Sequence, residues 1–142
     1  MLKRSWFLAM TLGALVGLAG FGQAQKSDPR VIVQVPFAFY VEGHLYPAGE
    51  YSFAARPNLV ELGRADGAPQ GRFLANAVEH SQPAKHGQVI FQCRGSQCFL
   101  YQVWIGGHEQ GQELTVPKRE KELREKRDPA VYLAYLDESR KR

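Results

Sequence analysis

The stretch "FQCRGSQCFLYQVW", residues 91–104, contains the only two cysteines of this 142-residue chain, with Gly95-Ser96 between them. A Gly-Ser pair between two runs rich in aromatic and apolar side chains is typical of a two-residue β-hairpin. With this turn, Cys93 stands opposite Cys98 in a non-hydrogen-bonded pair, where the side chains of two strands lie closest. The stretch therefore predicts a hairpin that a disulfide can brace.

The two cysteines do not match other common uses of cysteine. Four residues separate them, whereas a thioredoxin-type redox site has two. None of the histidines makes a structural-zinc spacing with Cys93 or Cys98; they are His44, His80, His86 and His108. We expect a structural Cys93–Cys98 disulfide, with a reduced and inert pair as the alternative, and we expect no metal and no cofactor.

Both faces of this hairpin are apolar, and a strand that is apolar on both faces needs cover on both. One face is expected to carry Val89, Phe91, Leu100 and Trp104, and the other Ile90, Phe99, Tyr101, Val103 and Ile105. A second sheet built from residues 31–62 can cover one face. We expect the C-terminal cluster to dock on the hairpin and help cover the other; it comprises Val131, Tyr132, Leu133, Tyr135 and Leu136.

The preceding sequence reads as further strands. Residues 31–41, VIVQVPFAFYV, alternate with period two, and Pro36 places this strand at a sheet edge or at a bulge. Turn signals such as Asp66-Gly67 separate further expected strands at 50–55, 59–63, 71–78, 88–94 and 97–105. We expect a mainly β domain over residues 25–112, an antiparallel β-sandwich or partly open barrel of about six strands.

Residues 113–142 form a separate compositional zone with nine basic and seven acidic residues. Pro117 suits the first turn of a helix, and Glu120 and Arg124 have the favourable i, i+4 spacing of a solvated helix. Asp128-Pro129 then predicts a second helix start. A strand is the alternative for the following AVYLAYL. We therefore expect a charged helical C-terminal extension.

The N-terminus has the pattern of a secretory signal peptide over residues 1–24. Lys3 and Arg4 precede an apolar run that ends in Gly22-Gln23-Ala24, which predicts cleavage after Ala24. An uncleaved membrane anchor is the alternative. No later segment is long and apolar enough to span a bilayer. The expected location is periplasmic or secreted.

The charge of the expected mature chain argues against nucleic acid as a partner. Without Lys3 and Arg4, sixteen basic residues face fourteen acidic ones, a net charge of +2. The basic run PKREKELREKR is interrupted by glutamates, as in a solvated helix face.

Candidate chemistry is sparse. His108-Glu109 begins like a zinc-protease motif, but the second histidine is missing, and GGHEQGQ at 106–112 is more typical of a loop. No catalytic motif is present, so we expect no enzyme. A weak candidate for a sugar-stacking platform is the aromatic set Tyr40, Tyr46, Tyr101 and Trp104; core packing explains these residues more simply.

"VPFAFYVEGHLYPAGEYSF" at 35–53, the hairpin and "QELTVPKREKEL" resemble sequences of uncharacterised small exported proteins common in acidobacteria. The resemblance covers most of residues 35–123. It implies export and a β-rich fold, and it assigns no catalytic or binding residue. The chain departs from the pattern in its two cysteines and in the segment from Asp128 onward.

Two functional hypotheses from different classes follow. The first is an exported, non-enzymatic structural or interaction module of the envelope, which contacts another envelope protein through Tyr132, Tyr135 and Leu136. The alternative is a small-ligand binding protein that holds a sugar or an apolar molecule. An enzyme assembled from distant residues is a third option.

Overall fold

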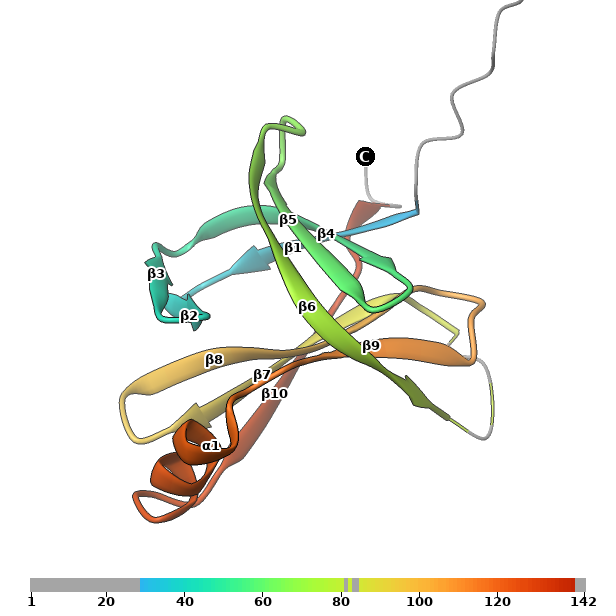
Figure 1. The fold of residues 1–142 in the computed structure, drawn as a ribbon. Helices are drawn as coiled ribbons and strands as arrows, with labels where there is room; N and C mark the ends of the chain where they lie inside the picture. The colour runs from blue at the N-terminus through green and yellow to red at the C-terminus, as the bar shows by residue number, and fades with distance from the viewer. Residues whose placement is uncertain (1–28, 81, 83–84, 140–142) are drawn as a thin grey trace, which may run out of the picture.

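The computed structural model describes residues 29–80, 82 and 85–139. The expected signal peptide, residues 1–24, lies outside this part, as do residues 140–142 of the expected extension. The described residues form ten strands and one helix (Figure 1). In chain order they are β1 (Arg30–Val35), β2 (Phe39–Val41), β3 (His44–Tyr46), β4 (Gly49–Arg56), β5 (Leu59–Arg64), β6 (Pro69–Glu79), β7 (Gln88–Arg94), β8 (Gln97–Trp104), β9 (Gln110–Leu114), α1 (Lys118–Glu125) and β10 (Val131–Leu136). The expected mainly β fold is confirmed.

The strands form one bent sheet that does not close into a barrel. Its main path is β1-β4-β5-β6-β9-β8-β2-β3, with β7 pairing both β8 and β10. The long strand β6 pairs β5 with its first half and β9 with its second half, so it passes from one layer to the other (Figure 1). Side chains of both layers fill the space between them, because Phe53, Phe91 and Val60 each have 0% exposure. The core is therefore packed.

The expected strand at 31–41 is divided at Pro36. Its first part, β1, pairs only with β4 and is an edge strand, whereas β2 pairs with β3 and with β8 in the other layer. The predicted alternation is confirmed, since Val31, Val33 and Phe39 are at most 1% exposed. Proline has no N–H for a ladder, and here it lies where the chain leaves one layer for the other.

The predicted hairpin is confirmed in register and turn. Cys93 pairs with Cys98 and Arg94 with Gln97, and the cysteines form a disulfide with a Cα–Cα distance of 4.0 Å. Gly95 has a φ of +59°, a conformation that glycine adopts without steric cost.

The sequence-based prediction placed Val103 and Trp104 on the wrong faces of β8. The β7–β8 register shifts between Ile90 and Phe91, so that Val103 faces Val89 and has 0% exposure in the shared core. An extra residue at a bulge moves every later side chain to the opposite face. Trp104 is consequently outside the main core cluster, although it is only 1% exposed.

The C-terminal zone combines the predicted helix with two strands: β9, which was not predicted, and β10, where a strand was the alternative to the expected second helix. Helix α1 begins after Pro117, as expected. The 112/113 boundary falls inside β9, and the expected second helix after Asp128 is wrong, because residues 131–136 form β10 and pair with β7. The edge of β7 supplies backbone hydrogen-bonding partners for residues 131–136. This tertiary pairing outweighs the local helix propensity.

The expected docking of the C-terminal cluster takes the form of strand addition. Leu133 and Tyr135 pack against the core, while Val131, Tyr132 and Leu136 are 52–59% exposed. The cluster thus extends the sheet and leaves one apolar side open. Within the part of the chain that the structure describes, no helix is long and apolar enough to cross a membrane.

Candidate functional site

Helix α1 lies over the outer face of the sheet beside β8 and forms a groove with it. The chain leaves β9, crosses this face through Thr115-Val116-Pro117 and enters α1. The guanidinium of Arg124 stacks on the ring of Phe99, with 3.6 Å between its central carbon and the ring centroid. No residue of α1 is buried. The helix therefore lies on the sheet without packing tightly into it.

We call this hollow the α1 groove. It consists of three adjoining pockets of about 390, 460 and 430 Å³, and Phe99 and Arg124 line all three. Pockets of this size are typical of small-molecule sites. Strands β2, β7, β8, β9 and β10 contribute further lining residues, so segments far apart in the sequence meet here.

One end of the groove is apolar. Tyr40 from β2 lies beside Phe99, with 5.7 Å between the ring centroids. Leu114, Val116 and exposed Leu74 complete this end. Burial of a ring or an alkyl chain at this end would be favourable, because apolar surface would be removed from water.

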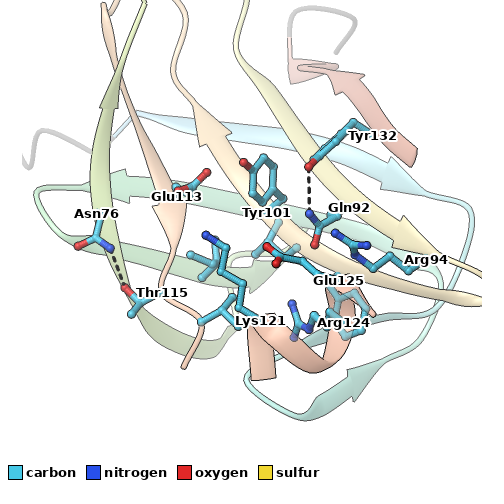
Figure 2. A pocket seen from close by; sticks show the side chains of 14 residues that line it. Asn76, Gln92, Arg94, Tyr101, Glu113, Thr115, Lys121, Arg124, Glu125 and Tyr132 are labelled. Atoms are coloured by element: carbon cyan, nitrogen blue, oxygen red, sulfur yellow. Dashed lines mark hydrogen bonds between the residues drawn. The ribbon is translucent and has the colours of Figure 1, made fainter. Parts of the chain in front are cut away.

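The other end is polar and carries hydrogen-bonding groups of both charges. Figure 2 shows Lys121 extending from α1 in the direction of Tyr101, with Glu113 on the neighbouring strand. The hydroxyl of Tyr101 bonds to the carboxylate of Glu113, and this bond, together with burial, raises the pKa of Tyr101 to about 12. Gln102 also donates to Glu113, at 3.0 Å. The shift therefore stabilises the protonated phenol of Tyr101.

The wall opposite α1 is formed by β7 and β10. The amide of Gln92 donates to the hydroxyl of Tyr132 at 3.1 Å, and the rings of Tyr101 and Tyr132 lie 5.2 Å apart (Figure 2). Arg94 donates through Nη1 to the backbone carbonyl of Asp128 at 2.8 Å. These contacts connect the hairpin, the chain after α1 and β10 along one side of the groove.

Two lining arginines have donors without partners. The Nε–H groups of Arg94 and Arg124 are buried and donate no hydrogen bond to any of the described residues. Arg124 engages Glu120 through Nη2, four residues earlier in α1. Buried polar groups in native proteins are nearly always hydrogen-bonded, so these two donors are exceptions among the groove residues.

The structure brings together only part of the expected aromatic platform. Tyr40 and Tyr101 both line the α1 groove. Tyr46 instead stacks on Phe39, with ring centroids 5.6 Å apart, at the margin of the core. Trp104 is 1% exposed and stacks on His80 at 3.9 Å, so it presents no free ring face to a ligand. Core packing, the simpler explanation, holds for Tyr46, whereas Trp104 is buried against His80 outside the main core cluster.

Sequence reasoning missed Phe99, Lys121 and Arg124 as groove residues. The charge pattern of the helix indicated only a solvated face. Phe99 was one of several apolar side chains on the hairpin face that was expected to be covered by another segment. Their proximity depends on how the chain crosses from β9 to α1. The described residues contain no cluster of three or more His, Cys, Asp or Glu side chains that could hold a metal ion.

A separate charged cluster lies on β1, β4, β5 and β6. Glu61 is 7% exposed, and its carboxylate contacts Arg72 at 3.1 Å, Arg30 at 3.5 Å and Arg56 at 3.8 Å. Each arginine comes from a different strand, so the carboxylate connects neighbouring strands across the sheet. The three guanidinium groups therefore supply the opposite charge that a buried carboxylate requires.

No family model, curated protein or solved structure matches this chain.

Proposed function

We propose that the chain is an exported, non-enzymatic binding module that holds a small ligand in the α1 groove. The ligand carries a ring with an apolar face and several hydrogen-bond acceptors, which is the chemistry of a sugar. The observation that carries this proposal is the combination of aromatic rings and polar side chains in one hollow, where Phe99 and Arg124 line all three pockets.

The two ends of the groove favour a ligand of mixed character. Tyr40 and Phe99 offer ring surface for stacking, and Lys121 offers an ammonium donor a short way along the same hollow. A purely apolar ligand would leave this donor without an acceptor, which is unfavourable. A sugar presents apolar C–H faces and hydroxyl oxygens together and satisfies both ends.

Support for export comes from the sequence pattern of residues 1–24, and a disulfide is compatible with an oxidising compartment. We expect the exported protein to begin at Gln25. N-terminal sequencing of protein from the periplasm or medium tests this expectation, and recovery of the full-length chain in the inner membrane would contradict it.

A ligand screen by thermal shift and NMR tests the binding proposal. The probes are mono- and oligosaccharides, with a long-chain alkyl detergent as the apolar comparison. We expect a saccharide to raise the midpoint and to shift signals of Tyr101 and Phe99. Lys121→Ala should weaken this binding, whereas Lys118→Ala should not, because Lys118 is on the same helix and does not line the groove.

Three results would overturn the assignment. If only the alkyl probe binds, the ligand is apolar and the polar end has another role. If no probe shifts any groove signal, or Lys118→Ala and Lys121→Ala weaken binding equally, the groove is not the site.

The expected partner contact through Tyr132, Tyr135 and Leu136 is the second candidate function. The ring of Tyr135 packs against Phe37 and Phe91, at centroid distances of 5.8 and 5.9 Å, so it is held inside the fold. Tyr132 and Leu136 are available at 52% and 59% exposure. We therefore propose a contact through the open side of β10.

A further inference from the structure

Four neighbouring strands of one layer carry charged side chains on the face opposite the core. Four residues lie side by side across β1, β4, β5 and β6; in this order they are Arg30, Ala54, Glu61 and Arg72. Phe53, the neighbour of Ala54, has 0% exposure in the core. Because side chains alternate along a strand, the row lies on the other face of the sheet. The short side chain of Ala54 leaves room for Arg30 to reach Glu61 at 3.5 Å.

A hollow of about 270 Å³ lies beside this row, and we call it the arginine hollow. Its lining includes Gly67 and Gly71, which have no side chain to fill it. The β5–β6 register shifts between Leu62 and Gly63, close to this place. Such irregularities often lie beside binding sites, because they redirect side chains and interrupt the ladder. The volume is below that of a typical site for a drug-sized molecule, so it suits one small chemical group.

The arginine hollow has more positive than negative charge. Its charged lining residues in the described part of the chain are Arg30, Arg56, Arg72 and Glu61. Arg30 and Arg72 by themselves outnumber the one carboxylate, and Arg56 adds a further positive charge 3.8 Å from it. Positive charges held this close repel one another, and a single carboxylate offsets only part of this repulsion. An anion in the hollow would offset the rest.

The guanidinium groups also have donors for such an anion. A guanidinium carries several N–H donors in a planar fork that fits phosphate oxygens. Arg72 contacts Glu61 through Nε at 3.1 Å, and its side chain is 72% exposed, so its amino groups are open to a ligand. Arg30 is held from another side, since its Nη1 donates to the hydroxyl of Ser52 at 3.3 Å. The hollow thus combines an anchored guanidinium with an accessible one.

We propose that the arginine hollow binds a tetrahedral oxyanion, that is, a phosphate or sulfate group. The guanidiniums come from both sides of Glu61, because β1 and β4 lie on one side of β5 and β6 lies on the other. A tetrahedral anion presents oxygens in several directions and can accept from both sides, whereas the oxygens of a carboxylate lie in one plane. The site shares no lining residue with the α1 groove and does not depend on the groove ligand.

NMR titration of the protein tests the proposal, with inorganic phosphate and inorganic sulfate in separate arms. We expect saturable shifts of the amide signals of Gly67 and Gly71, and the anion that binds more tightly identifies the ligand group. Arg72→Gln should weaken this binding roughly tenfold, because it removes charged hydrogen-bond donors. Arg64→Gln is the matched control, because Arg64 is an exposed arginine of β5 that does not line the hollow.

Two further arms separate this site from weaker explanations. Chloride at the same ionic strength measures general screening of charge, and acetate measures binding of a carboxylate. Arg72→Lys covers the case in which Arg72→Gln does not fold; it keeps the charge but loses the planar fork, so binding should still weaken. The absence of saturable shifts would overturn the proposal, as would equal shifts with chloride or acetate binding as tight as that of the tetrahedral anions. Unchanged binding in Arg72→Lys, or equal weakening by Arg72→Gln and Arg64→Gln, would also contradict it.

Discussion

The carboxylate of Asp137 accepts a hydrogen bond from the backbone N–H of Ile32 at 2.9 Å, across 105 positions of the chain. The neighbouring Glu138 donates its own N–H to the carbonyl of Ile32 at 2.8 Å. Together these bonds connect the chain after β10 to β1, the other free edge of the bent sheet. The sheet is open, but its two edge strands are joined at this point.

We expect Asp137→Ala to lower the free energy of unfolding by about 1–3 kcal/mol, because the N–H of Ile32 loses a charged acceptor. Asp137 also accepts bonds from the N–H and hydroxyl of Ser139. Urea denaturation measures the effect. Glu138→Ala is the matched control, since Glu138 bonds to β1 through its backbone. Equal losses in the two variants would show that the carboxylate has no special role.

The Cys93–Cys98 disulfide should contribute little to stability. It closes a loop with only four intervening residues, so its removal by the double serine substitution should cost about 2 kcal/mol or less. Mass spectrometry with and without reductant should differ by two hydrogen atoms. The hairpin register should survive, because the turn at Gly95-Ser96 and the β7–β8 ladder remain. Complete unfolding of the double variant would contradict this expectation.

Gly111 cannot accept a side chain without a shift of Trp104. A Cβ at this position would lie 2.5 Å from the indole ring. Gly111→Ala should therefore cost about 1–3 kcal/mol of stability and change the Trp fluorescence. Gly49→Ala is the control, because the nearest atom to its added Cβ is 3.8 Å away. A stable Gly111→Ala protein with unchanged fluorescence would show that the ring moves freely.

The bond between Tyr101 and Glu113 predicts a dependence of stability on alkaline pH. The folded state raises the pKa of Tyr101 from 10.0 to about 12, so it holds this proton more tightly than the unfolded state. The resulting stabilisation is fully present below pH 10 and is lost as the pH rises to about 12. Tyr101→Phe should remove this component of the pH dependence. Spectroscopic titration of tyrosinate in Glu113→Gln should show a lower pKa for Tyr101.

Truncation after Arg127 removes β10 and should lower the thermal midpoint clearly. Leu133 and Tyr135 would no longer cover the core, and burial of such side chains contributes ~1.5–3 kcal/mol each when complete. A hydrophobic dye should bind the exposed edge of β7. As a comparison, the thermal midpoint of Tyr132→Ala should stay close to that of the unchanged protein, because half of this side chain is already in solvent. An unchanged midpoint after truncation would show that β10 does not stabilise the domain.

Alternation and turn chemistry made the hairpin and most strands predictable. The stretch VIVQVPFAFYV predicted its buried face correctly, since each inward side chain was marked by its position in a period of two. The period of two did not predict that Val103 faces the core, because this orientation results from a bulge in the pairing between β7 and β8. In the groove, the sequence indicated Tyr40 and Tyr101 as candidate ligand-binding residues. It did not indicate Arg124, whose position over Phe99 depends on where α1 lies on the sheet.

By itself, the sequence determined the mainly β fold, the Cys93–Cys98 pairing and the helix after Pro117, because these follow from local periodicity and short-range turn geometry. The tertiary structure decided the state of residues 131–136, where the edge of β7 selected a strand against the helix signal of Asp128-Pro129. It also decided which aromatic residues meet in the α1 groove. Both outcomes depend on contacts between residues far apart in the chain, and no local pattern records such contacts.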